Sequence, residues 1–291
     1  MHTTLIEPTE LATRLTDPSW AILDCRFELA QPQWGASAYA AGHIPHALYA
    51  HLDEDLSGPV AASTGRHPLP EINALAETFG RWGIDAQVQV VAYDQGNGAY
   101  AARLWWLLRW MGHSRVAVLN GGFAAWQRAG LPVDAKPATR QPRRFVALPT
   151  ANQVVTTAEL ERALARGELA TGEAMLLVDA RAADRFAGEN ETIDPVAGHV
   201  PGAHNHPFAR NLEASGEFLP APELRRRWQA TLRKVPVERA ISMCGSGVTA
   251  CHNLLALEIA GLSGARLYAG SWSEWIRDPA RPVARTATAA R

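Results

Sequence analysis

The sequence contains one succession of motifs twice, and this internal repeat constrains the fold more than any other feature. The matching pairs are AILDCR (21–26) with LLVDAR (176–181) and AGHIPHA (41–47) with AGHVPGA (197–203). Spacing is preserved as well, because Asp24 precedes His43 by 19 residues and Asp179 precedes His199 by 20. Chance similarity does not preserve both order and spacing. We therefore expect two copies of one structural unit.

Each copy alternates short apolar runs with longer amphipathic stretches. Strands are expected at 21–25, 88–94, 116–122, 175–180, 238–244 and 265–270. Helices are expected at 71–83, 99–112, 123–130, 223–231 and 249–261. Strands separated by helices favour a mainly parallel sheet with helices on both faces. The predicted fold class is α/β, as a tandem duplication.

The two copies are joined by a polar segment at 134–150, which carries prolines and arginines and shows no clear periodicity. We therefore divide the chain within this linker, into residues 1–140 and 141–291. A length of 291 residues agrees with two domains of ordinary size.

Composition excludes several classes of protein. Hydrophobic residues make up 47% and charged residues 20%, as in soluble globular proteins, and the net charge of −1 offers no attraction to nucleic acid or an anionic membrane. The N-terminal stretch resembles no secretory signal, and no apolar run is long enough to span a membrane. Three scattered cysteines suit neither a disulfide framework nor a zinc site. We expect a cytoplasmic protein that binds no metal.

Cys244 is the clearest candidate nucleophile. It ends a predicted strand and begins the loop CGSGVTA, which leads into a predicted helix. In doubly wound α/β units, functional groups gather where the carboxyl end of a strand turns into a helix. The corresponding position of the first copy holds Asp94, so only the second copy has a nucleophile at this point. Cys25 and Cys251 are expected to be apolar packing residues.

The residues after Cys244 provide a cradle for an anion. Gly245 and Gly247 allow a tight turn that directs successive N–H groups at one point, while Ser246 and Thr249 add hydroxyl groups. The following helix directs the positive end of its dipole there. For a cysteine, the stabilised anion is the thiolate, which is the nucleophilic form.

Taken together, the motifs GHIP, GHVPGA, DAR and CGSGVTA resemble those of two-domain rhodanese-type sulfurtransferases over almost the whole chain. This resemblance implies a non-catalytic first domain and a catalytic second domain. It also implies that Cys244 takes sulfur from a small-molecule donor as a persulfide and passes it to a thiol or cyanide, with no cofactor. A thioredoxin-like reductant is one candidate acceptor. Such transfer in two half-reactions is covalent catalysis with ping-pong kinetics.

Within this family, a loop without Lys or Arg is similar to that of 3-mercaptopyruvate sulfurtransferases. The resemblance places Arg185 at the donor anion and Ser246 on a proton path. It adds Gly245, Gly247, Val248 and Thr249 of the loop, and Asp53 and His67 of the first half, to the substrate site. The second arginine usual in these enzymes is missing from 188–199.

Four other functions are alternatives. Thiosulfate is the second candidate donor, and a persulfide carrier without turnover is a non-enzymatic reading. A cysteine phosphatase would need an arginine six residues after the nucleophile, where Ala250 stands. Nucleotide binding would rest on the weak glycine patterns at 96–101 and 245–250, and neither follows the first strand of its unit.

Overall fold

The computed structural model describes residues 1–169 and 174–286. The chain separates into two compact units. The first unit comprises Met1–Gly58, Leu69–Thr150 and Leu212–Phe218, and the second comprises Pro59–Pro68, Ala151–Asn211 and Leu219–Arg291. Each unit therefore includes one short segment from the other half of the sequence. The division of the repeat into 1–140 and 141–291 remains our proposal.

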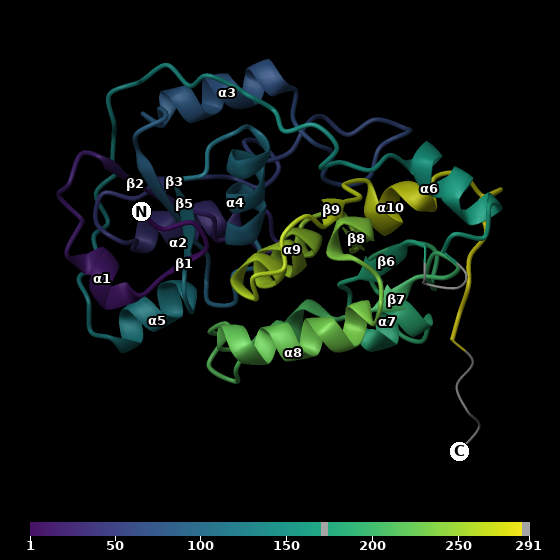
Figure 1. The fold of residues 1–291 in the computed structure, drawn as a ribbon. Helices are drawn as coiled ribbons and strands as arrows, with labels where there is room; N and C mark the ends of the chain where they lie inside the picture. The colour runs from purple at the N-terminus through teal and green to yellow at the C-terminus, as the bar shows by residue number, and fades with distance from the viewer. Residues whose placement is uncertain (170–173, 287–291) are drawn as a thin grey trace. The chain divides into compact units, whose positions relative to one another are not determined.

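The first unit contains a five-stranded sheet with strand order β1-β5-β4-β2-β3, and its strands pair in parallel. The strands are β1 (Leu5–Ile6), β2 (Trp20–Asp24), β3 (Leu48–Tyr49), β4 (Gln89–Tyr93) and β5 (Val116–Leu119). The helices are α1 (Pro8–Ala12), α2 (Trp34–Ala41), α3 (Ile72–Arg81), α4 (Ala101–Trp110) and α5 (Gly122–Arg128), and Figure 1 labels them.

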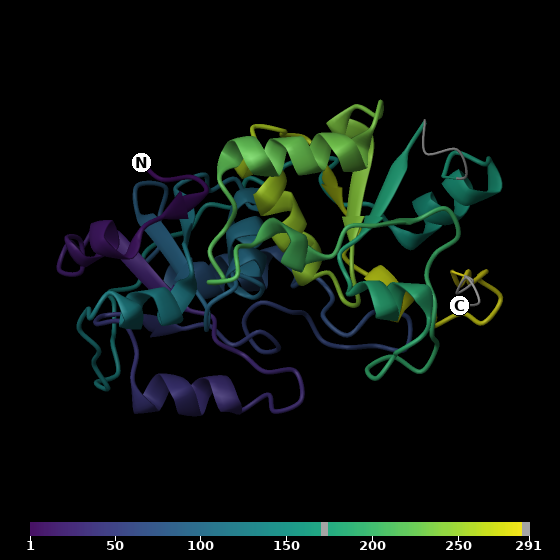
Figure 2. The same cartoon turned by 90° about the horizontal axis from the view of Figure 1, so that it is seen from below.

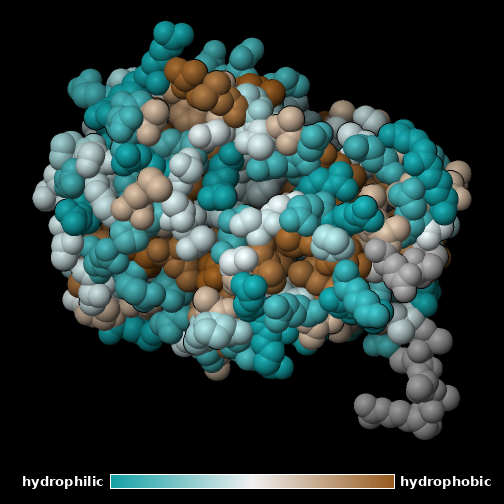
Figure 3. All heavy atoms as spheres, viewed as in Figure 1, coloured by the Kyte–Doolittle hydropathy of each residue, from teal (hydrophilic) through white to brown (hydrophobic). Residues whose placement is uncertain are grey.

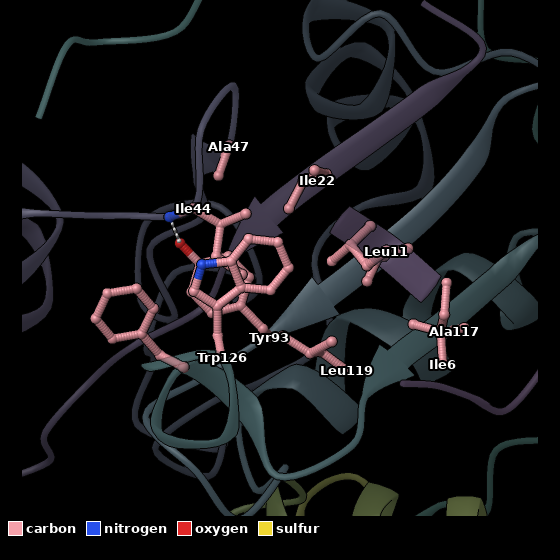
Figure 4. Packing of buried hydrophobic residues seen from close by; sticks show 11 residues of the cluster. Ile6, Leu11, Ile22, Ile44, Ala47, Tyr93, Ala117, Leu119 and Trp126 are labelled. Atoms are coloured by element: carbon pink, nitrogen blue, oxygen red, sulfur yellow. Dashed lines mark hydrogen bonds between the residues drawn. The ribbon is translucent and has the colours of Figure 1, made fainter. Parts of the chain in front are cut away.

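The core of the first unit shows why both faces of its sheet are covered. Val91 and Tyr93 of β4 belong to an apolar cluster that also includes Trp126 of α5. Figure 4 labels Tyr93 and Trp126 in this cluster. Val90 and Ala92 point to the opposite face, because side chains alternate along a strand, and α4 packs against β4 and β5. Both sets of side chains are buried. The predicted α/β fold is confirmed.

The second unit repeats this plan with a parallel four-stranded sheet of order β7-β6-β8-β9. The strands are β6 (Leu176–Asp179), β7 (His204–Asn205), β8 (Ala240–Met243) and β9 (Arg266–Leu267). The helices are α6 (Thr157–Ala165), α7 (Ala183–Ala187), α8 (Ala221–Leu232), α9 (Thr249–Ile259) and α10 (Ser271–Trp275), with 3₁₀ turns at Phe208–Asn211 and Val237–Arg239. Helix α8 packs against α9, as Figure 2 shows in green and yellow-green.

A buried ion pair explains why the repeated motifs occur together. At the end of β2, the Asp24 carboxylate accepts hydrogen bonds from Arg26 Nε at 2.9 Å and Nη2 at 2.6 Å. The same Nη2 donates to the carbonyl oxygen of Gly42 in the AGH motif at 2.7 Å. Asp179 and Arg181 make the equivalent contacts in the second unit. The pair joins the end of a strand to a distant loop in each copy.

The surface is mixed in polarity. Figure 3 shows hydrophilic side chains over much of one face, with apolar side chains reaching the surface between them. Val146 and Leu148, in the segment before α6, are among the exposed large apolar residues. No helix in the part of the chain that the structure describes is long and apolar enough to cross a bilayer.

Beneath α8 lies a buried polar network centred on His206. The imidazole stacks on Trp228 with ring centroids 4.0 Å apart, and its nitrogens bond Thr231 Oγ1 at 2.7 Å and Asn211 Oδ1 at 3.1 Å. Burial lowers the pKa of His206 to about 4. The folded protein therefore keeps this imidazole neutral at a pH where an exposed histidine is charged.

This network predicts a loss of stability in weak acid. The unfolded chain protonates His206 near pH 6.5 and the folded chain only near pH 4, so the unfolded state binds more protons between these values. The stability contribution is complete above pH 6.5 and is lost as the pH falls, by about 3 kcal/mol at pH 4. Urea unfolding of wild type and His206→Asn at pH 7 and pH 4 should show a smaller pH effect in the variant. Equal pH effects would contradict the assignment.

Candidate active site

Cys244 follows β8, one of the two central strands of the second sheet, and lies in the loop that leads into α9. Its side chain is buried, and its Sγ atom accepts a hydrogen bond from the backbone N–H of Gly247 at 3.1 Å. The start of α9, at Thr249, adds the positive end of the helix dipole. One N–H donor and the positive end of a helix dipole are thus directed at this sulfur.

Gly247 adopts a conformation that only glycine takes without strain. Its φ is +79°, and a Cβ atom at this position would collide with the carbonyl oxygen of Ala269. The turn directs the Gly247 N–H to Cys244, while the Gly247 carbonyl oxygen accepts a hydrogen bond from the Cys251 thiol at 3.2 Å. Cys251 therefore packs beneath the loop and bonds to its backbone.

The first residues of α10 hold the other side of the loop. The Trp272 N–H donates to the carbonyl oxygen of Cys244 at 3.0 Å, and the Ser273 N–H donates to that of Gly245 at 2.8 Å. The N–H of Cys244 in turn donates to Ser271 Oγ at 3.0 Å. Because the carbonyl groups are turned toward α10, the loop is fixed with its Gly247 N–H toward the sulfur.

Ser246, two residues after Cys244 in the loop, and His67 are brought together. Both side chains are buried, and Ser246 Oγ lies 2.7 Å from His67 Nδ1, so that one hydrogen bond joins them. His67 belongs to the segment Pro59–Pro68, which is part of the second unit although it comes from the first half of the sequence. A hydroxyl joined to an imidazole can carry a proton.

Arg185 lies beside the loop in an ion-pair cluster. Its Nε and Nη2 atoms donate to the Glu191 carboxylate at 3.0 and 2.8 Å, and Nη2 also reaches Asp194 at 3.1 Å. Burial acts to raise the pKa of Glu191, but the bonds from Arg185 and from backbone N–H groups outweigh it and lower this pKa. Glu191 is thus an ionised partner that holds Arg185 in place.

Arg66 joins the same cluster, and the sequence did not reveal it. Its Nη1 atom forms an ion pair with Asp194, and its Nη2 atom lies 3.0 Å from where a Cβ atom on Gly245 would stand. Arg185 Nη2 lies 3.8 Å from the same point. Two guanidinium groups therefore approach the residue that follows the nucleophile. The one sequence feature that could have indicated Arg66 is its position directly before the predicted site residue His67.

Among the remaining predicted site residues, Val248 is buried behind the loop and Thr249 begins α9 partly exposed. Asp53 is an exposed residue of the first unit, where its N–H donates to His51 Nδ1 at 3.2 Å. The role of Asp53 stays a prediction.

In the first unit, Asp94 occupies the position that corresponds to Cys244. Its carboxylate is buried and accepts N–H bonds from Gly96, Gly98, Tyr100 and Ala101, at 2.9 to 3.2 Å. Burial raises the pKa of Asp94, whereas these four bonds favour its ionised form. The first loop is thus filled by its own side chain and offers no nucleophile.

Comparison with known proteins agrees with the duplicated architecture. The family model of the rhodanese-like domain matches the chain twice, at residues 7–129 and 156–278. The chain belongs to the rhodanese-like family. The two matches coincide with the two copies of the sequence repeat, so the expected resemblance is confirmed.

Relatives of this rhodanese-like protein are named either 3-mercaptopyruvate sulfurtransferase or thiosulfate sulfurtransferase. A probable 3-mercaptopyruvate sulfurtransferase of Pseudomonas aeruginosa is 50% identical over 96% of this chain and 97% of its own length. A thiosulfate sulfurtransferase of Rattus norvegicus is 33% identical over 89% of this chain and 86% of its own. Among solved structures, a 3-mercaptopyruvate sulfurtransferase from Leishmania major has a TM-score of 0.82 and 31% identity, covering 95% of this chain and 76% of that one.

The left-handed backbone of Gly247 and its close approach to Ala269 predict that replacing this glycine lowers the free energy of unfolding. Gly247→Ala adds both a left-handed alanine and a collision with Ala269, whereas Gly167→Ala, at φ +71° with open space around it, adds only the first. We expect Gly167→Ala to lose about 1–2 kcal/mol of unfolding free energy and Gly247→Ala to lose clearly more. Urea unfolding measures both. Equal losses would show that the loop does not need close approach to Ala269.

Proposed function

We propose that this rhodanese-like protein transfers sulfur from 3-mercaptopyruvate, through a persulfide on Cys244, to a thiol acceptor or cyanide. The observation that carries the proposal is the buried Cys244 sulfur, which accepts the Gly247 N–H at the head of α9. The predicted sulfurtransferase activity is confirmed by the comparisons, because the relatives that match most of this chain are named sulfurtransferases.

In the first half-reaction, the Cys244 thiolate attacks the sulfur of 3-mercaptopyruvate. A sulfur–sulfur bond forms as the carbon–sulfur bond breaks, and the electron pair of the broken bond passes to the methylene carbon as pyruvate enolate. The thiol proton of the donor is transferred to that carbon, which yields pyruvate and an enzyme persulfide. An acceptor thiolate or cyanide then removes the outer sulfur and restores the Cys244 thiolate.

Ser246 and His67 are suited to carry the proton in this step. Their hydrogen bond of 2.7 Å joins two buried side chains, and Ser246 belongs to the same loop as Cys244. We assign Ser246 as the group that delivers the proton to the enolate carbon and His67 as the group that exchanges a proton with Ser246. Removal of either group should slow the protonation of carbon rather than the attack of sulfur.

The charges around the loop favour a monoanionic donor. Arg66 and Arg185 contribute two positive charges, and Asp194 and Glu191 contribute two negative charges in contact with them. The four groups are therefore neutral together. Guanidinium hydrogen bonds remain for a carboxylate, while the field offers no surplus charge for a dianion next to a thiolate. This argument supports 3-mercaptopyruvate over thiosulfate.

The setting of the reaction completes the proposal. Cys25, Cys244 and Cys251 are all unbridged and buried, which agrees with a reducing compartment. We propose a cytoplasmic location and a small thiol or a thioredoxin-like protein as acceptor.

The proton path predicts that the two donors respond differently to one substitution. Thiosulfate releases sulfite and needs no protonation of carbon, so Ser246→Ala should slow pyruvate release about 100-fold or more and change sulfite release only a few-fold. Single-turnover rates with each donor measure this. His67→Asn should behave like Ser246→Ala. Ser242→Ala serves as control, because this buried hydroxyl at β8 donates to the carbonyl oxygen of Ala250 in α9.

Equal slowing with both donors would contradict the proton path. A wild-type kcat/KM higher with thiosulfate than with 3-mercaptopyruvate would make thiosulfate the preferred donor. A single round of sulfur transfer without turnover would favour the carrier reading.

A further inference from the structure

Ser271, the first residue of α10, has a backbone conformation that serine rarely adopts. Its φ is +55°, in the left-handed region, and the residue is fully buried. This region is unfavourable for a residue that carries a Cβ atom. Such residues persist only where the surrounding structure holds them, and they gather at functional sites. The contacts that hold Ser271 are made with the Cys244 loop and with the residues just before α10.

The first unit has a glycine, Gly122, at the equivalent position. Gly122 is the first residue of α5 and has the same φ of +55°. In each helix the next residue donates its N–H to the carbonyl oxygen of Asp94 or Cys244, so Gly122 and Ser271 correspond. A Cβ atom on Gly122 would stand 2.6 Å from the Asp94 carbonyl oxygen. The first unit therefore has no room for a side chain at this point, whereas the second unit accommodates a serine.

The Ser271 hydroxyl joins two backbone groups. Its Oγ atom accepts the N–H of Cys244 at 3.0 Å and donates to the carbonyl oxygen of Tyr268 at 2.9 Å. A hydroxyl group has a single proton to donate. Because Tyr268 receives this proton, Oγ faces Cys244 as an acceptor. The hydroxyl therefore acts on the backbone of Cys244 and not on its sulfur.

Hydrogen bonds from α10 hold the peptide groups on both sides of Cys244. The N–H binds Ser271 Oγ, and the carbonyl oxygen binds the Trp272 N–H at 3.0 Å. Cys244 is buried, so its N–H would lose its partner at a cost if the hydroxyl were removed. The two bonds fix the backbone of Cys244 and thereby the direction of its side chain, whose sulfur accepts the Gly247 N–H at 3.1 Å.

We propose that Ser271 is a positioning residue, whose hydroxyl keeps the Cys244 sulfur aligned for attack on the sulfur donor. The inference rests on the proposed sulfur transfer and adds a residue that acts through the backbone of the nucleophile. A glycine would adopt this backbone conformation with less strain, as Gly122 does. The serine is therefore retained for its hydroxyl group.

Two substitutions separate the hydroxyl from the backbone conformation. Ser271→Gly and Ser271→Ala both remove the hydroxyl, but only glycine relieves the left-handed strain. Ser271→Gly should therefore unfold at a higher urea concentration than Ser271→Ala, and it provides a folded variant if Ser271→Ala does not fold. The positioning role predicts that both variants react equally slowly. A purely structural role predicts that reactivity follows stability, with Ser271→Gly close to wild type.

The test measures single-turnover formation of the Cys244 persulfide with 3-mercaptopyruvate and with thiosulfate. Loss of one buried hydrogen bond at the nucleophile should slow the maximal rate about 10-fold in both Ser271 variants and with both donors. The donor concentration that gives half the maximal rate should change less than about 2-fold, because Ser271 acts on the attacking group. Ser242→Ala is the matched control. It removes another buried hydroxyl, which donates to the Ala250 carbonyl oxygen, and should leave the rates near wild type.

The use of two donors separates this inference from the proposed function. Slowing with only one donor, or a Ser271→Gly rate close to wild type, would overturn the role of Ser271. Equal slowing in Ser242→Ala would overturn it as well. A wild type that forms the persulfide from thiosulfate but not from 3-mercaptopyruvate would overturn the proposed function, and the thiosulfate rates would still decide whether Ser271 aligns the sulfur.

Discussion

Two hydrogen bonds from the start of a short helix fix the geometry on which the site depends. Trp272 and Ser273 donate to the carbonyl groups of Cys244 and Gly245, and this turns the loop so that its Gly247 N–H faces the sulfur. The first unit contains the same arrangement, since the first N–H groups of α5 donate to the carbonyl oxygens of Asp94 and Gln95. This loop geometry is therefore a feature of the repeated unit and does not depend on the presence of a nucleophile.

The two units differ in what occupies this common geometry. Asp94 accepts four N–H bonds with its own carboxylate, so the first loop is satisfied internally. Cys244 places a single polarisable atom at the equivalent point, and the second unit adds the hydrogen-bonded pair Ser246 and His67 and two arginines that approach Gly245. One side chain at the end of one strand thus separates a structural copy from a reactive one.

The sequence predicted the parts of this account that rest on local patterns. The alternation of apolar runs and amphipathic stretches gave the parallel sheets, and the glycines around Cys244 indicated the anion cradle. Arg66 could not be found in this way, because its partners Asp194 and Gly245 lie far along the chain and no periodicity links them. The two-residue strands β3 and β7 are also too short to leave a pattern.

Mass spectrometry of the protein after incubation with 3-mercaptopyruvate, without an acceptor, tests the central claim most directly. We predict that wild type gains about 32 Da, the mass of one sulfur atom held as a covalent intermediate, on the peptide that contains Cys244. Cys25→Ala should gain the same mass and Cys244→Ser none. Absence of the gain in wild type, or its persistence in Cys244→Ser, would contradict the account.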